Sequence, residues 1–319
     1  TYKKGECVLR MTGDMDALNA VMRDPVLFRI SDASHTLQKD KYKVWPLYDF
    51  ETVIAEEFTG VTHIFRSSEF GKMRIELQNR IKDHLGFKKQ TVRQYGRFSI
   101  VGAETKGRVI REMIEKGDVD GWDDPRLVTL KAMRRRGIQP ETFYELAVES
   151  GMSTSETRLD FSVLASINRK LIDDSTKRFF FVKDAKKVHV AHDLKTVMVP
   201  NHPSNEEMGK RRVSLSESFY VQDPIMSRKV YRFMHMFNLE NDKFVSEEYD
   251  SKLKAKIIHA VPADDAVDVQ VLMSDGSLVS GKGEAALSKL KEGEVVQFER
   301  MFFCRLDDKE KMLFVYSHD

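Results

Sequence analysis

Two runs of three cationic residues are the clearest groups in the sequence that could bind phosphate. Each run lies beside a glycine that marks a loop. Arginine and lysine donate hydrogen bonds to phosphate oxygens, and such contacts hold a folded nucleic acid without reading its sequence. Either run alone is equally compatible with a solvated surface. The runs comprise Arg134, Arg135 and Arg136, and Lys210, Arg211 and Arg212.

A string of distinctive residues precedes the arginine run. It reads Gly-Trp-Asp-Asp-Pro-Arg at residues 121–126, and a tight acidic turn of this kind can cap the helix that follows it. The whole phrase, GWDDPRLVTLKAMRRRG, resembles the signature shared by archaeal-type glutamyl-tRNA synthetases and glutaminyl-tRNA synthetases. We also predict tRNA contacts from Trp122, Arg126 and Arg178.

Five further strings are similar to this family and occur in the family's order. MRDPVLFRI, which starts at Met22, resembles the insertion that holds the tRNA acceptor end. WPLYDFE and GVTHIFRSSEF resemble the second half of the nucleotide-binding fold, and HPSNEEMGKRRV and VVQFERMFFCRLD resemble the anticodon-binding barrels. The resemblance therefore spans essentially all 319 residues.

One position within GVTHIFRSSEF distinguishes the two kinds of enzyme. Glutaminyl enzymes carry a small uncharged residue where this sequence has Arg66, whereas glutamyl enzymes carry arginine. A guanidinium can fork onto a carboxylate and offers no acceptor to an amide, so it suits L-glutamate better than glutamine. The resemblance also implies that Tyr48 and Phe70 line the amino-acid pocket and that His63 lies near it.

Class I synthetases hold ATP between an early signature, usually HIGH, and a late one, usually KMSKS. None of the nine histidines, of which His35 is the first, has a His-x-Gly-His context, so we expect the early signature upstream of Thr1. Counting back from Gly121 assigns the late signature to a degenerate loop in which a glycine replaces the family's second lysine. Its flanking cations would supply positive charge to the ATP phosphates. The loop is Glu104, Thr105, Lys106, Gly107 and Arg108.

A second string is closer to the late signature in its letters. Met226-Ser227-Arg228-Lys229 follows strand-rich sequence, and we interpret it as a surface turn. Mg²⁺ would accompany ATP, but we assign no ligand to it and predict no other metal site.

The composition fits a folded, multidomain protein of the cytoplasm. The chain is 41% hydrophobic and 32% charged, and no apolar run approaches the ~18 residues that a membrane span needs. With 52 basic and 50 acidic residues the net charge is +2, so global charge does not indicate a nucleic-acid partner. Cys7 and Cys304 lie far apart, which excludes a disulfide framework or cysteine-rich zinc site and fits a reducing compartment.

The apolar periodicity changes along the chain. Residues 44–50, 52–58 and 61–65 have an α/β rhythm, and we expect 44–50 and 61–65 to share one sheet. Helical spacing dominates residues 106–181, with Pro140 in a first turn and Gly151 as a stop. After residue 180 alternation predicts an all-β region. Its hairpin signal is Asp275-Gly276. The predicted helical core comprises Phe143, Leu146, Ala147, Leu159, Val163, Leu164, Ile167 and Leu171.

These patterns and the resemblance together imply an α/β plus all-β protein in four parts. Residues 1–47 would be the remainder of the acceptor-stem insertion and 48–100 the second half of a Rossmann-like class I catalytic fold. Residues 101–184 would be a helical stem-contact domain and 185–319 the anticodon-binding β-barrels. The implied activity is ATP-dependent attachment of glutamate to tRNA(Glu). Whether tRNA(Gln) is also charged with glutamate, as in some archaeal relatives, stays open at the level of sequence. We expect the chain to be inactive without the N-terminal catalytic half.

Three alternatives stay open. Glutaminyl-tRNA synthetase is the closest, and Arg66 argues against it. A tRNA-binding module without catalysis is the second, because the early signature is absent and the late one is degenerate. An unrelated β-barrel protein with chance basic loops is the third.

Overall fold

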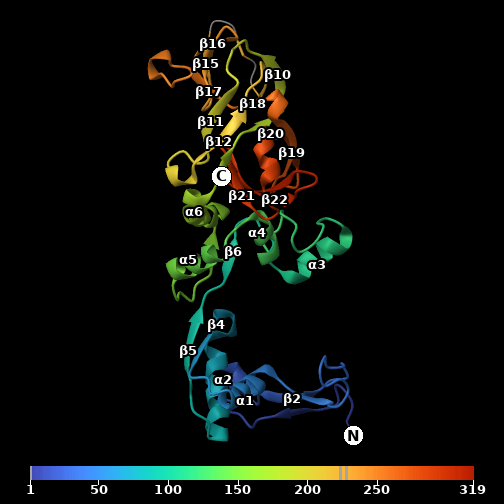
Figure 1. The fold of residues 1–319 in the computed structure, drawn as a ribbon. Coiled ribbons are helices and arrows are strands. Elements are labelled where there is room, and N and C mark those ends of the chain that lie inside the picture. The colour runs from blue at the N-terminus through green and yellow to red at the C-terminus, as the bar shows by residue number, and fades with distance from the viewer. Residues whose placement is uncertain (1, 223–224, 227–228) are drawn as a thin grey trace. The chain divides into compact units, whose positions relative to one another are not determined.

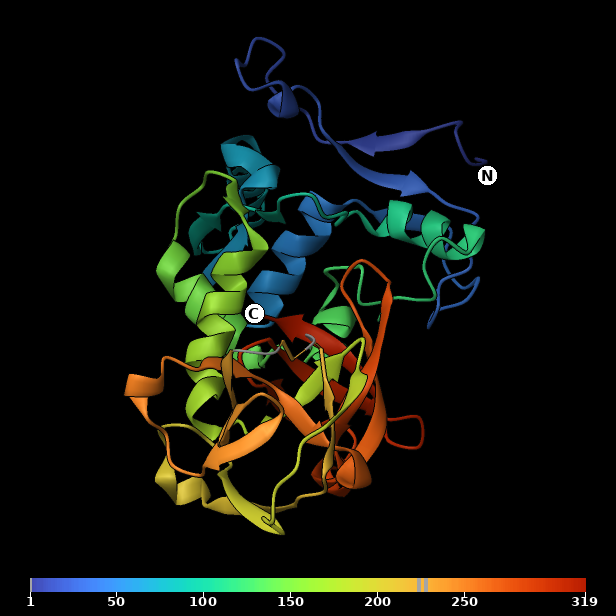
Figure 2. The same ribbon diagram turned by 90° about the horizontal axis from the view of Figure 1, so that it is seen from above.

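The computed structural model describes residues 2–222, 225–226 and 229–319, which form two compact units. The first unit spans residues 1–99 and 150–158, and the second spans residues 100–149 and 159–319. Figures 1 and 2 show the ribbon from two directions. Each unit has its own hydrophobic core and is described separately.

The first unit combines a small antiparallel sheet with two packed helices. Its core contains Val53, Leu77 and Ile81, one residue from the first helix and two from the second. Partly buried residues of the sheet and its loops pack against this core, including Met11 and Leu27. The elements are β1 (Val8–Arg10), β2 (Val26–Ile30) and β3 (Val44–Pro46), paired in that order, and α1 (Tyr48–Phe58) and α2 (Gly71–Leu85).

A parallel ladder completes the first unit. β4 (His63–Ser67) pairs with β5 (Thr91–Tyr95), and α2 provides the long crossover that a parallel pair requires. The prediction that residues 44–50 and 61–65 share one sheet is wrong. Residues 44–46 pair with β2, and the chain turns into α1 at Tyr48.

The second unit begins with helices. Its helical elements are α3 (Gly107–Lys116), α4 (Leu130–Arg136), α5 (Pro140–Ser150) and α6 (Phe161–Ile172). The predicted start at Pro140 is confirmed, and α5 ends just before Gly151. α5 and α6 lie against each other in both ribbon views (Figures 1 and 2), with Phe143 and Leu164 in one apolar cluster.

The predicted helical core is only partly correct. Leu146, Leu164 and Ile167 are buried. Val163 and Leu171 are 38% and 42% exposed because α6 buries a narrower face than the apolar residues occupy. Ala147 is also exposed, and Leu159 belongs to the short strand β7 (Thr157–Leu159), which pairs with β6 (Phe98–Ile100).

The strands that follow residue 177 confirm the predicted all-β region. The largest sheet has seven strands in the order β8-β21-β22-β23-β19-β20-β9. α4 and α6 contact it at β22 and β23, as Figure 1 shows for α4. The hairpin predicted at Asp275-Gly276 joins β19 to β20. The strands are β8 (Arg178–Phe179), β9 (Phe181–Lys183), β19 (Ala266–Leu272), β20 (Leu278–Glu284), β21 (Val295–Phe298), β22 (Phe302–Asp308) and β23 (Leu313–His318).

The expected closed barrels are not found in the described residues. The two edge strands of the seven-stranded sheet, β8 and β9, are not hydrogen-bonded to each other, and only Phe180 separates them along the chain. Three smaller sheets surround a second core that includes Phe180, Phe219 and Phe233. Their strands are β10 (Lys186–His189), β11 (Thr196–Pro200), β12 (Lys210–Ser214), β13 (Ser218–Val221), β14 (Val230–Phe233), β15 (Asn238–Glu240), β16 (Lys243–Ser246), β17 (Lys256–Ile258) and β18 (Ala260–Pro262).

Short 3₁₀ turns connect several elements. They span Ala20–Met22, Ser68–Phe70, Asp173–Ser175, Glu206–Met208, Ser251–Leu253, Ala263–Asp265 and Ala285–Lys289. Across the described ranges, no helix combines the length and the apolar character that crossing a membrane requires.

Candidate functional site

The acidic turn at residues 121–126 is organised by one buried carboxylate. Asp124 is 1% exposed. Its oxygens accept the backbone N–H groups of Asp120 and Arg126, each at 2.9 Å, and the Arg126 guanidinium through Nε at 2.9 Å and Nη2 at 2.7 Å. Burial raises the pKa of Asp124, but these hydrogen bonds outweigh it and lower the pKa to about 2. Arg126 is therefore engaged in holding the turn.

The turn does not cap α4 in the way that the sequence suggested. Thr129 is the N-cap, and its Oγ1 accepts the backbone N–H of Ala132 at 3.1 Å and donates to the carbonyl of Trp122. Threonine is a preferred N-cap residue because its hydroxyl satisfies a free N–H of the first turn. The prediction of an acidic cap is wrong.

The loop assigned to the ATP phosphates lies next to this turn. A Cβ atom built on Gly107 would be 3.7 Å from the Trp122 ring. Lys106 is the N-cap position of α3, and the Arg108 side chain is 85% exposed, 3.8 Å from Glu112. The Glu104 carboxylate accepts the backbone N–H groups of Thr105 and Lys106 at 2.9 and 2.7 Å.

The arginine run contains three different environments. Arg134 is exposed, and the structure gives its side chain no ion pair within the described ranges. Arg135 donates to Asp307 from Nε at 3.1 Å and Nη2 at 2.8 Å, and lies 3.6 Å from Asp123. It thus ties the acidic turn to β22.

Arg136 is 4% exposed and does not face solvent. Its guanidinium donates to the carbonyls of Ser317 at 2.7 Å and Tyr316 at 3.3 Å, and its central carbon lies 4.2 Å from the centre of the Phe161 ring. Burial lowers the pKa of Arg136 to about 10. The prediction that Arg136 donates to phosphate is wrong, because its donors are buried and bound to the backbone.

The second cationic run lies on a strand and not in a loop. Side chains alternate along β12, so Lys210 and Arg212 are exposed while Arg211 points inward. Arg211 donates to Glu284 from Nε at 2.7 Å and Nη2 at 2.6 Å and to the carbonyl of Pro200 at 2.8 Å. Glu284 is 1% exposed. The predicted RNA contact by Arg211 is therefore wrong, whereas those of Lys210 and Arg212 stay predictions.

Arg178 is also buried, with 4% exposure. It donates to Asp173 at 2.7 Å, so the predicted tRNA contact is contradicted for this residue as well. Asp173, Asp174 and His202 form the group of potential metal ligands found among the described residues. His202 Nδ1 already accepts the N–H of Asn205 at 2.8 Å, and Nε2 lies 3.1 Å from the carbonyl of Asp173. These imidazole atoms are therefore committed to the protein, and the group does not fit Mg²⁺.

Two residues predicted to line the amino-acid pocket, Tyr48 and Phe70, stack on each other. The rings of Tyr48 and Phe70 lie 5.0 Å apart with an angle of 19° between their planes, and the two residues are 46% and 37% exposed. His63 is exposed on β4, and its Nδ1 is 3.0 Å from Thr62 Oγ1. Arg66 lies three residues further along the strand and is buried.

Arg66 belongs to a polar network that the sequence does not indicate. Nη1 donates to Gln78 and Nη2 to Glu56, each at 2.5 Å, and Lys82 donates to the same Glu56 carboxylate at 3.0 Å. Arg66 Nε is buried without a partner among the described residues. Two cations and one carboxylate leave this group with a net positive charge.

No pattern in the sequence indicates Arg74 as a site residue. This residue of α2 forms an ion pair with Asp49, and its side chain is 45% exposed. It lines a cavity of about 390 Å³ together with Tyr48, Arg10 and Arg23. The spacing from Phe70 to Arg74 is one helical turn, but no pattern in the sequence brings Arg10 and Arg23 to the same place.

The string at residues 226–229 is described only in part. Ser227 and Arg228 lie outside the described residues, and Met226 is 54% exposed.

Comparison with known proteins defines the class. A family model described as tRNA synthetases class I (E and Q), catalytic domain, matches residues 1–174. The corresponding anti-codon binding domain matches residues 176–260. The chain belongs to this family of class I tRNA synthetases, and the resemblance drawn from its motifs is confirmed.

Individual relatives narrow the comparison. The chain is 37% identical to the glutamate–tRNA ligase of Nitrosopumilus maritimus, over 99% of this chain and 59% of that protein. It is 34% identical to the glutamate–tRNA ligase of Korarchaeum cryptofilum, over 100% of this chain and 58% of that protein. It is 36% identical to the glutamate–tRNA ligase of Pyrococcus abyssi, over 99% of this chain and 59% of that protein. The chain thus spans just under three fifths of the length of these curated relatives.

Proposed function

We propose that the chain carries the tRNA-binding part and the later half of the active site of a cytoplasmic glutamate–tRNA ligase. The observation that carries this proposal is the likeness to glutamate–tRNA ligases over 99% of the chain. The partners would be L-glutamate, ATP and tRNA(Glu), with tRNA(Gln) as a second acceptor. Both cysteines are free, which suits a reducing compartment.

The amino-acid site would use charge and shape from the first unit. The stacked rings of Tyr48 and Phe70 offer an apolar wall to the methylenes of glutamate. Arg66 is buried and its Nη groups are bound to Gln78 and Glu56, so it would act on the side-chain carboxylate through the charge of its network and not through a direct hydrogen bond. Because the network of Arg66, Lys82 and Glu56 keeps a net positive charge, it favours a carboxylate over an amide. This arrangement supports glutamate over glutamine.

The ATP site would use the loop before α3. Lys106 and Arg108 carry cations near a helix start, where backbone N–H groups favour phosphate. Mg²⁺, when bound with ATP, supplies positive charge for the phosphates. This chain would position ATP and stabilise charge while a carboxylate oxygen of glutamate bonds to the α-phosphorus in line and pyrophosphate leaves, which gives the glutamyl adenylate.

The first test concerns glutamate selection in the full-length enzyme. Arg66→Ala removes a positive charge that would face the glutamate side-chain carboxylate, and loss of a desolvated charge partner costs roughly 3 kcal/mol, or about a 100-fold loss in glutamate kcat/KM. Arg80→Ala on the exposed face of α2 is the matched control. Steady-state ATP–pyrophosphate exchange gives kcat/KM for glutamate and for glutamine in each variant. An unchanged glutamate kcat/KM in Arg66→Ala, or wild-type preference for glutamine, contradicts the proposal.

The second test separates tRNA binding from catalysis. The 319-residue chain should bind tRNA(Glu) but show no glutamate-dependent ATP–pyrophosphate exchange, because ATP would be held from one side only. Adding the remaining part of the catalytic domain as a separate polypeptide should restore part of the exchange activity. Robust exchange by the chain alone would mean that ATP is held by other residues.

A further inference from the structure

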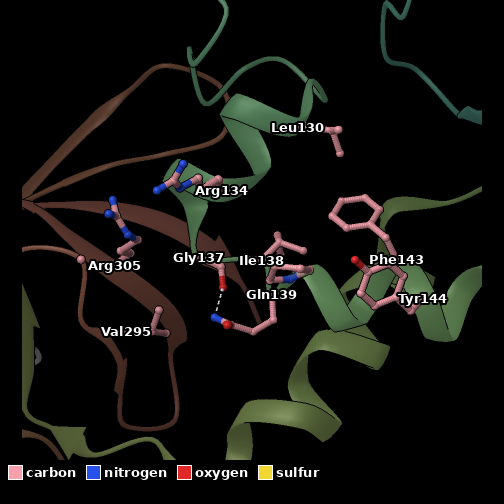
Figure 3. A pocket seen from close by; sticks show the side chains of 11 residues that line it. Leu130, Arg134, Gly137, Ile138, Gln139, Phe143, Tyr144, Val295 and Arg305 are labelled. Atoms are coloured by element: carbon pink, nitrogen blue, oxygen red, sulfur yellow. Dashed lines mark hydrogen bonds between the residues drawn. The ribbon is translucent and has the colours of Figure 1, made fainter.

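A cavity of about 510 Å³ opens in the second unit between helices and strands. α4 and α5 with the loop between them form one wall, and β21 and β22 form the other (Figure 3). The walls approach closely because Gly137 has a left-handed backbone (φ +88°), and a Cβ atom there would lie 2.8 Å from Val295. The volume falls within the range typical of small-ligand sites.

The cavity has an apolar end and a cationic end. Figure 3 shows Leu130, Phe143 and Tyr144 on one side and the guanidinium groups of Arg134 and Arg305 on the other. Leu130 is 72% exposed and Tyr144 is 69% exposed. Neither side chain is buried in the folded core, so both are accessible to a ligand in this cavity.

The two cations are held differently. Arg305 Nη1 lies 3.4 Å from Asp307, whose carboxylate also binds Arg135. Arg134 has no such carboxylate within the described part of the chain. An anion at this end of the cavity would therefore meet one positioned guanidinium and one that is free to turn toward it.

We propose that this cavity binds one unstacked nucleotide of the bound tRNA. The base stacks on the Phe143 and Tyr144 side, and Arg134 contacts the adjoining phosphate. An unstacked base has an apolar face attached to a phosphate, which matches the two ends of the cavity. The inference rests on the proposed function, because it takes tRNA as the ligand.

Ultraviolet cross-linking tests the stacking directly. The 319-residue chain would be irradiated with in vitro transcribed tRNA(Glu), digested with nuclease and trypsin, and examined by mass spectrometry. Cleavage after Arg136 and Arg158 releases one peptide that contains both Phe143 and Tyr144. We expect this peptide to carry a single-nucleotide remnant, and Tyr144→Ala to reduce its yield.

Matched variants test the contribution to affinity. Tyr144→Ala should weaken tRNA(Glu) binding about 10-fold, as expected for loss of one stacked base. Arg134→Gln should reduce the slope of log affinity against log salt by about 1. Val148→Ala on α5 and Lys131→Gln on α4 change exposed residues outside the cavity and should bind like wild type. Thermal unfolding would verify that each variant is folded.

The outcomes separate this inference from the proposed function. If wild type binds tRNA, Tyr144→Ala binds within about twofold of it and the peptide carries no nucleotide, the cavity assignment alone is wrong. If wild type does not bind tRNA, both are overturned. Free AMP, GMP, CMP and UMP should not compete at micromolar concentration, and competition would indicate a mononucleotide site instead.

Discussion

The two cationic runs, residues 134–136 on α4 and 210–212 on β12, have similar sequences but different structures. Successive side chains of a helix are rotated by about 100°, so the first run passes from exposed Arg134 to buried Arg136. Side chains of a strand alternate, so Arg211 alone of the second run points inward. Secondary structure, and not the charge run itself, decides which cations remain available to a partner.

The inward arginines also differ in what neutralises them. Arg211 faces the buried carboxylate of Glu284. Arg136 faces two backbone carbonyls and the Phe161 ring, and no carboxylate bonds to it within the described residues. A buried charge with a charged partner and one with only dipoles respond differently when a neighbour is removed, and this difference can be measured.

The largest effect should come from breaking the pair in the second run. Glu284→Ala leaves the Arg211 charge buried without its carboxylate, which costs about 3–5 kcal/mol. Glu284 also accepts the backbone N–H of Phe180 at 2.5 Å, so the same change leaves that donor unpaired. Urea unfolding of the chain measures the loss. Asp268→Ala, which breaks the exposed pair with Lys282, is the control and should cost at most about 1 kcal/mol. Equal losses would contradict the comparison.

A smaller effect is expected in the first run. Arg136→Met keeps an unbranched side chain against Phe161 and removes the donors to two carbonyls. Leaving a buried acceptor unpaired costs about 1–3 kcal/mol, so this variant should be less destabilised than Glu284→Ala. The same urea experiment ranks the two variants, and a reversed order would show that the backbone carbonyls hold Arg136 more firmly than the carboxylate holds Arg211.

The outward cations should affect RNA and not stability. Arg134→Gln should weaken the binding of many tRNAs by a similar factor, as expected for contacts to the RNA backbone. The double variant Lys210→Gln, Arg212→Gln should instead reduce the discrimination between tRNAs with different anticodons. Each lost phosphate contact lowers the salt slope by about 1. Filter binding with several tRNAs measures both, and Ser214→Ala on the same face of β12 is the control. Wild-type binding by all variants at about 150 mM salt would exclude these contacts.

The smallest effect should be the pH dependence of the acidic turn. The pKa of Asp124 is lowered from 3.8 to about 2 in the folded protein. Its contribution to stability is therefore complete above about pH 4 and is lost as the pH falls toward 2. Thermal unfolding from pH 2 to pH 5 should show a flatter profile for Asp124→Asn than for wild type. Identical profiles would remove Asp124 from this role.

Local patterns predicted much of the fold. Proline at a first helical turn and the Asp275-Gly276 hairpin depend on backbone conformations that short sequences determine, and both are found where they were expected. The strand-rich region after residue 177 follows in the same way from alternation. The motifs indicated the family because they preserve order along the chain as well as composition.

Long-range packing accounts for what could not be predicted. The Arg66 network joins α1, β4 and α2 through Glu56 and Gln78, and no local pattern pairs residues from three elements. Arg178 and Arg211 are residue types that usually lie on the surface. Asp173, in the turn before Arg178, and Glu284, distant in sequence from Arg211, bind them in the interior. Which carboxylate pairs with which arginine depends on tertiary structure, so the periodicity of the sequence does not predict it.

The parallel ladder of β4 and β5 bears on how the protein behaves at high concentration. In the described residues these strands pair only with each other, so their outer sides present unpaired backbone groups. Phe65 of β4 and Tyr95 of β5 are 62% and 41% exposed. An open strand edge flanked by aromatic rings is a template for association between molecules. In the 319-residue chain without the rest of the catalytic domain, we therefore expect this ladder to be a site of self-association.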